Sequence, residues 1–210
     1  MPSTELMTAL PIASATFMPQ WRQEFSRQAG GSPRVADLGP EIWTAKIQST
    51  VMLHADAIDA AALVDQMRGS LDTFYVWDPR RPYPRLDPGG VLLGGSAVTI
   101  YDLGTDNKSL RLAGLPVGYV ISRGDKLAWD QGTSPVRRCL HEFVAGAVAD
   151  SLGRIAFTEV APHIRSGAST GLAVMLKRPA AEMMIMPGSY DFPPSGPTTS
   201  TLSFTAIQVP

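Results

Sequence analysis

A run of prolines near the middle of the chain constrains its fold more than any other feature. Residues 78–90 read DPRRPYPRLDPGG, with prolines at positions 79, 82, 84 and 88 and glycines at 89 and 90. Proline fixes φ and has no backbone N–H to donate, so neither a regular helix nor a central strand can pass through this stretch. The sequence therefore predicts a domain boundary or a semi-rigid connector here, which we call the joint.

Length and composition narrow the class of protein on either side of the joint. A chain of 210 residues is long enough for one large domain or two small ones. Its 19 glycines and 18 prolines favour many short strands and turns over long helices. A formal net charge of −1 argues against a dedicated nucleic-acid-binding protein. The single cysteine, Cys139, excludes an internal disulfide.

The N-terminal stretch carries none of the usual targeting signals. It lacks a basic start followed by a long apolar run, so we expect no signal peptide. No apolar stretch in the chain approaches the roughly 18 residues that a membrane span needs. Residues 1–19 mix small and polar side chains, and we expect an extended arm there.

The segments before the joint predict strands and one helix. WTAKI (43–47) alternates apolar and polar residues with the period of a half-buried strand, and TFYVW (73–77) is apolar on both faces. The spacing of Ala60, Leu63, Val64, Met67 and Leu71 predicts a helix that begins with Asp56 as N-cap and closes at Gly69. QAGGSPRVADLGP (28–40) is a loop by composition.

The second half of the chain predicts a small barrel and then a return to the first domain. Five or six short strands fall within residues 90–168, enough for a barrel of the OB or SH3 type, with Ser151-Leu152-Gly153 as a hairpin loop. Residues 1–89 and 169–210 are then expected to form the first domain, a discontinuous one of the β-sandwich or β-barrel kind, with residues 90–168 inserted in it. The predicted fold class is mainly β with one short helix and an inserted small β-barrel.

Candidate catalytic residues are few. Cys139 and His141 lie two apart and share a face of a strand, which would suit a nucleophile and its base in a small hydrolase, but would equally suit two ordinary strand side chains. With His163 they make at most three of the four ligands that structural zinc requires, and no second cysteine exists. We therefore predict no catalytic residue, no metal and no cofactor.

The joint carries the strongest candidate contact residues. Arg80, Arg81, Tyr83 and Arg85 could grip a phosphate backbone or meet carboxylates of a neighbouring subunit. The near-zero net charge favours the contact between subunits.

Two further groups of residues invite a functional interpretation. Tyr101, Tyr119 and Trp129 could stack on sugars if they were exposed, although Trp129 fits a core position more simply. Arg123-Gly124-Asp125 forms the tripeptide of cell-adhesion signals, but Gly124 and Asp125 suit a turn between two strands. We expect Arg123 to be solvated and Asp125 to have no partner that would make it an acid or a base.

The order of segments resembles distal tail or minor tail-tip proteins of long-tailed, siphovirus-like bacteriophages of alphaproteobacteria. The resemblance runs from about Trp21 to Val209 and lies in the succession of GPEIWTAKI, SLDTFYVWDPRRPYPRLDP, SLRLAGLPVGYVISRGDKLAW, RRCLHEFVAGAVADSLGRIAFTEVAPHIR and KRPAAEMMIMPGSY.

The resemblance implies a structural role in a virion. Distal tail proteins form a ring, commonly of six copies, between the tail tube and the tip or baseplate hub. Their first domain resembles the tail-tube protein, and some carry an added barrel. The expected partners are further copies of the chain, the tail tube protein, the tip hub protein and the tape measure protein, without sequence-specific nucleic-acid binding or a membrane. The expected location is the tail tip, after assembly in the host bacterial cytoplasm. A carbohydrate-binding tail module for host adsorption is the alternative.

Overall fold

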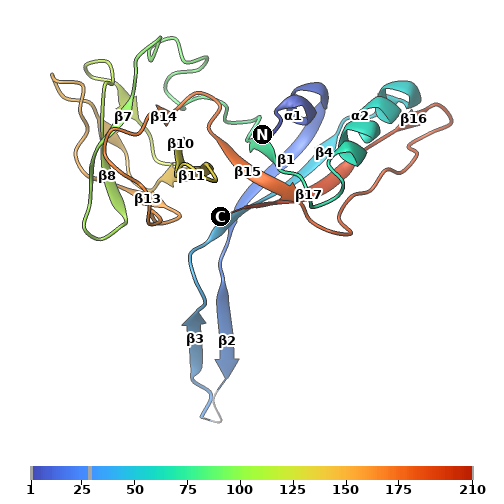
Figure 1. The fold of residues 1–210 in the computed structure, drawn as a ribbon, viewed down its shortest axis with the longest axis horizontal. Coiled ribbons are helices and arrows are strands. Elements are labelled where there is room, and N and C mark those ends of the chain that lie inside the picture. The colour runs from blue at the N-terminus through green and yellow to red at the C-terminus, as the bar shows by residue number, and fades with distance from the viewer. Residues whose placement is uncertain (1, 28–29, 210) are drawn as a thin grey trace.

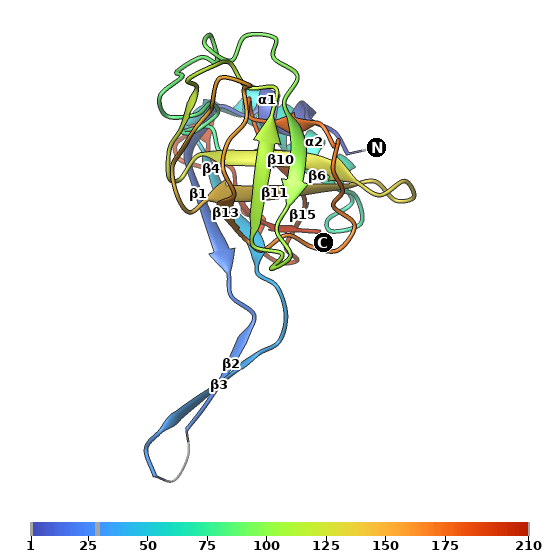
Figure 2. The same ribbon diagram turned by 90° about the vertical axis from the view of Figure 1, so that its left-hand side faces the viewer.

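A computed structural model describes residues 2–27 and 30–209, and it shows a mainly β protein, as the sequence predicts. Two bodies, each built on an antiparallel sheet, lie side by side, and a two-stranded arm projects from one of them (Figures 1 and 2). Among the described residues, no helix is both long and apolar enough to cross a membrane.

The first body is a five-stranded sheet with two helices. Its strand order is β1 (Ile12–Gln20), β4 (Ile42–Ser49), β17 (Ser203–Gln208), β15 (Ala180–Ile185) and β6 (Phe74–Trp77). A short ladder of β5 (Met52–Leu53) with β16 (Thr199–Ser200) extends it. The predicted alternation in WTAKI and in the last strand is confirmed, because Ile47, Leu202 and Phe204 are almost fully buried.

The helices differ in part from the prediction. Helix α2 spans His54–Gln66, and Leu53 rather than Asp56 is its N-cap, so Asp56 lies in the first turn. Ala60, Val64 and Met67 are buried as expected, whereas Leu71 lies beyond the helix and is 76% exposed. The expected extended arm at residues 1–19 is wrong for residues 2–19, and residue 1 lies outside the described part of the chain. Residues 2–19 form a second helix, α1 (Glu5–Ala9), too short for its spacing to be recognised, and then β1.

The second body is a closed barrel. Its strands run in the order β14 (Val174–Met175), β10 (Lys126–Gln131), β11 (Arg137–Phe143), β13 (Thr158–Ala161), β8 (Ser109–Ala113) and β7 (Thr99–Leu103). The two ends of this order meet, because the backbone N–H groups of Ile100 and Val174 donate to the carbonyls of Leu172 and Val98. Side chains such as Trp129, Phe143 and Leu110 fill the interior.

Two expectations about the barrel need correction. Residues 151–153 do form a turn, and the segments on its two sides do pair, but through β11 and β13, whereas β12 (Ala147–Val148), nearer the turn, pairs with β9 (Val120–Ile121). The barrel core also includes Leu172, Val174 and Leu176, which lie beyond the predicted boundary at residue 168.

The two bodies share an apolar contact. Ala128 and Leu140 of the barrel belong to the hydrophobic core of the first body. The indole Nε1–H of Trp43 donates to the Leu140 carbonyl oxygen at 2.8 Å, and the guanidinium of Arg138 lies 3.9 Å from the ring centre of Tyr75. The barrel is therefore packed against the sheet rather than tethered to it.

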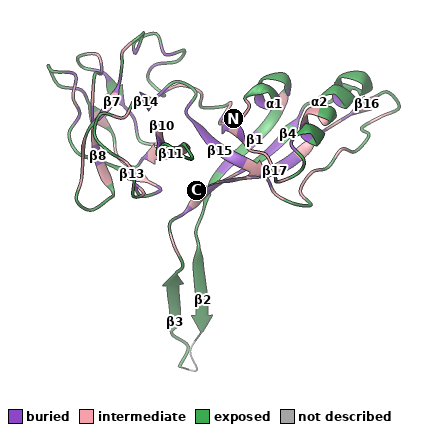
Figure 3. Ribbon diagram, in the orientation of Figure 1, coloured by how far each residue is buried: buried purple, intermediate pink, exposed green. Residues whose placement is uncertain are grey.

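The arm is a hairpin of β2 (Gln23–Arg27) and β3 (Pro33–Asp37). The prediction of a loop at residues 28–40 is therefore wrong for Pro33–Asp37; residues 28 and 29 of that range lie outside the described part of the chain. This strand was missed because it has no buried face and therefore no alternating apolar pattern. Its glycine, proline and small polar residues are typical of a loop. Residues 21–27 and 30–38 are all exposed, as the green hairpin in Figure 3 shows.

Candidate functional site: the arginine-lined pocket of the joint

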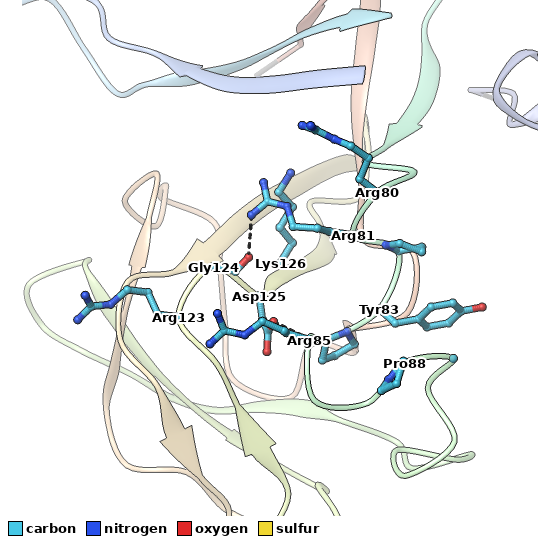
Figure 4. Close-up of a pocket in the computed structure, with 12 residues that line it drawn as sticks. Arg80, Arg81, Tyr83, Arg85, Pro88, Arg123, Gly124, Asp125 and Lys126 are labelled. Atoms are coloured by element: carbon cyan, nitrogen blue, oxygen red, sulfur yellow. Dashed lines mark hydrogen bonds between the residues drawn. The ribbon is translucent and has the colours of Figure 1, made fainter. Parts of the chain in front are cut away.

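The joint and the turn between β9 and β10 together line a pocket of about 440 Å³ (Figure 4). The joint contributes residues 80–85 together with Pro88 and Gly89, and the turn contributes residues 123–126. The proline-rich stretch thus does more than separate two domains, because its backbone forms one wall of a cationic cavity.

A buried ion pair anchors the start of the joint. Asp78 is fully buried and accepts hydrogen bonds from Lys126 Nζ at 3.2 Å, Arg81 Nε at 3.1 Å and the backbone N–H of Arg80 at 3.0 Å. Burial alone would raise the pKa of Asp78, but Lys126 and these hydrogen bonds outweigh burial and lower it. Burial lowers the pKa of Lys126, an effect that Asp78 opposes. The pair therefore links the joint to β10.

A second carboxylate holds the middle of the joint. Asp125 Oδ2 accepts the backbone N–H of Ser122 at 2.7 Å, and its Oδ1 accepts the backbone N–H of Arg85 at 2.9 Å. Gly124 has a φ of 89°, so the predicted turn at this glycine is present. Asp125 bonds its own turn through Ser122, and it also binds the backbone of a residue 40 positions away in the sequence, a contact that the sequence did not indicate.

The charges around the pocket are not fully balanced. Arg81 is shared between Asp78 and Glu142, the latter at 3.6 Å, and Arg80 lies 3.9 Å from Asp78. Within the part of the chain that the structure describes, the side chains of Arg85 and Arg123 form no ion pair. Two guanidinium groups are thus available for carboxylate or phosphate oxygens, which their planar forks match.

The four predicted contact residues do not form one patch. In Figure 4, Arg81 and Arg85 extend to the same side as Arg123, whereas the half-buried Tyr83 points the opposite way and Arg80 points away from the group. Arg123 belongs to the site although the sequence indicated only a solvated turn residue. Three long-range contacts hold the joint beside this turn: Asp125 with the backbone N–H of Arg85, the Gly124 carbonyl with Arg81, and Lys126 with Asp78. No local sequence pattern signals them.

The predicted sugar-stacking residues are poorly placed for that purpose. Trp129 is fully buried in the barrel, and Tyr119 is buried with its hydroxyl donating to Asp87 Oδ2 at 3.2 Å. A sugar cannot reach either ring, so stacking by these two residues is excluded, and the expected core position of Trp129 is confirmed. Tyr101 is 40% exposed, but the guanidiniums of Arg154 and Arg111 lie 4.1 and 5.2 Å from its ring centre.

Cys139 and His141 share the barrel-facing side of β11 as predicted, but the environment does not suit catalysis. Burial raises the pKa of the Cys139 thiol to about 11 and lowers that of His141 to about 4. The Nδ1–H of His141 donates to the Pro162 carbonyl oxygen at 2.6 Å, and its ring stacks on Trp129 with centroids 4.3 Å apart. The thiol is therefore neither ionised nor accessible, and the proposed nucleophile and base do not form.

Metal ligation finds no support in the geometry. Among residues 2–27 and 30–209, no group of three His, Cys, Asp or Glu side chains is placed to hold a metal ion. His163, the third sequence candidate, is exposed, whereas His141 and Cys139 are buried.

Comparison with known proteins adds no name to this geometry. No protein-family model matches the chain, and no curated protein matches it significantly.

Proposed function

We propose that this protein is a structural subunit of a bacteriophage tail tip, assembling as a ring that joins the tail tube to the tip or baseplate hub. The order of its segments supports this proposal, and so does a mainly β architecture of a sheet body with a packed barrel. On this proposal the ring has six copies, and its other partners are the tail tube, tip hub and tape measure proteins. Its location is the tail tip of the virion.

The observation that carries the proposal is the uncovered arm. Phe25 and Val35 lie directly opposite each other across β2 and β3, and they are 58% and 59% exposed. An isolated two-stranded hairpin is marginally stable in water at best. No other segment among the described residues covers this one, so its stable form requires a contact with another molecule.

The edges of the first sheet offer a further contact. At one edge, β6 is partly covered by a parallel bridge between Phe74 and Ser3. At the other edge, β1 pairs only with β4 within the described chain. A free edge strand is a template for pairing with a neighbouring chain, and a ring built from head-to-tail contacts needs two different complementary surfaces.

The joint pocket fits the same role. Arg85 and Arg123 would bind carboxylates of a neighbouring subunit, with Arg81 beside them, so that the pocket contributes to the subunit interface rather than to catalysis. A carbohydrate-binding role has less support, because two of its three candidate residues are buried.

The test is the assembly state of the purified protein, measured by light scattering after size exclusion and by electron microscopy. We expect closed rings. Replacing residues 22–38 with an Asn-Gly turn should give folded monomers that still melt in one cooperative transition, because the backbone N–H of Leu38 bonds to the Arg22 carbonyl and the arm closes at that point. A wild-type protein that stays monomeric at high concentration and is absent from phage particles would overturn the proposal.

A further inference from the structure

A groove with a partly apolar floor and an acidic rim lies on the first body, away from the joint pocket. It has a volume of about 560 Å³ and lies between α2 and the segment that leads into it. Met52 and Ala60 form its buried floor, and Val51 and Leu53 border it with 61% and 63% of their surfaces exposed. Apolar side chains so exposed beside a hollow are typical of a contact surface.

The rim of this groove is negatively charged. Asp56 and Asp59 line it from α2 and are both exposed. Neither carboxylate forms an ion pair with any other residue that the structure describes. The groove therefore combines an apolar floor with two unneutralised carboxylates.

The arm has the complementary pattern. Side chains alternate between the two faces of a strand, so Phe25 and its cross-strand neighbour Val35 share a face with the next pair, Arg27 and Pro33. The guanidinium of Arg27 lies 5.9 Å from the ring centre of Phe25. One face of the hairpin thus presents an aromatic ring and an aliphatic side chain, with the cation of Arg27 on one side of them and the carboxylate of Asp37 on the other.

The arm cannot fill the groove of its own chain. In Figures 1 and 2, β2 and β3 extend away from the sheet and from α2. An occupant of the groove that carries the arm must therefore be another molecule.

We propose that the arm of one copy docks in the groove of the next, with Phe25 and Val35 on the apolar floor and Arg27 against Asp56 and Asp59. This inference rests on the proposed self-assembly and names the two surfaces that make it. The contact joins two different patches, so it repeats head to tail and closes into a ring when the rotation between copies permits.

Charge reversal tests this pairing in the full-length protein. Arg27→Glu alone, or Asp56→Lys with Asp59→Lys, should each weaken self-association at least tenfold in sedimentation analysis. The three changes together in one chain should restore association toward the wild-type value. Arg34→Glu is the matched control, because Arg34 pairs with Ser26 on the opposite face of the arm and its reversal should have a smaller effect.

A cross-link provides a second measurement that does not depend on charge. In a Cys139→Ala background, Val35→Cys and Val51→Cys should form disulfides between copies under mild oxidation and give a ladder of covalent oligomers. A monomeric wild-type protein would overturn both this inference and the proposed function. The groove assignment alone would be overturned by a wild-type oligomer whose association is unchanged by either charge reversal and by their combination, and whose cysteine variants form no cross-link.

Discussion

The contact between the two bodies and the projecting arm differ in whether their aromatic and charged side chains are covered by the chain itself. Both present aromatic and charged side chains from antiparallel strands. In the contact, Trp43, Lys126 and Asp78 are almost completely enclosed, and their polar atoms find partners within the chain. In the arm, Phe25 and Val35 remain open to solvent. The chain completes the first surface itself and leaves the second for another molecule, so changes to the two should differ in what they damage.

The largest effect on stability should come from the contact. Lys126→Met removes the charge that faces the buried Asp78, and it should lower the free energy of unfolding by about 3 kcal/mol, since breaking one partner of a buried pair leaves the other uncompensated. Urea denaturation measures this change. Lys108→Met, an exposed lysine, is the control. A loss below about 1 kcal/mol would show that Arg81 alone neutralises Asp78.

The next effect is a dependence on pH that the barrel core imposes. The folded-state pKa of His141 is about 4, below its ordinary value of 6.5. Below pH 6.5 His141 binds a proton in the unfolded chain but not in the folded chain. The free energy of unfolding should therefore fall by about 2 kcal/mol between pH 6.5 and pH 5. His141→Gln should flatten this slope, and the exposed His163→Gln should not. Equal slopes in all three proteins would contradict the assignment.

A smaller effect should follow from Gly124→Val. The left-handed backbone at this glycine, with φ at 89°, costs about 1–2 kcal/mol for a β-branched side chain. The nearest atom to an added Cβ is 3.7 Å away, so the cost comes from the backbone and not from a clash. Gly95→Val is matched to it, because Gly95 has open space and no such φ. Thermal melts that shift equally for both variants would rule out the turn as the cause.

The smallest effect on stability should come from the arm. Phe25→Ala should change the free energy of unfolding of the monomer by no more than about 0.5 kcal/mol, because an exposed side chain far from the core contributes little to it. The same variant should weaken self-association, whereas Ser26→Ala on the other face should not. A monomer clearly destabilised by Phe25→Ala would mean that the arm packs on its own chain.

Features that depend on local alternation could be predicted from the sequence. The buried sides of β4, β6 and β17 follow the period of two, and the core face of α2 follows helical spacing as far as Met67. The mainly β class and the turn at Gly124 follow from composition and turn chemistry.

Features that depend on distant partners could not be predicted. The closure of the barrel at Ile100 and Leu172, and the pairing of β9 with β12, join residues that no local pattern connects. The arm escaped prediction for a different reason: its strands have no buried face, so their apolar residues form no periodic signal. The pocket could not be predicted either, because the bond between Asp125 and Arg85 that forms it joins residues far apart in the sequence.

The way the joint is attached has a mechanical consequence. A proline-rich connector fixed only at its ends would let the barrel swing. Here Asp78 is bound to Lys126, the backbone of Arg85 to Asp125, and the Pro82 carbonyl to the backbone N–H of Arg178, so the connector is fastened along its length. A force applied to the barrel is therefore passed to the sheet instead of bending the connector. The two bodies should rotate together as one rigid unit.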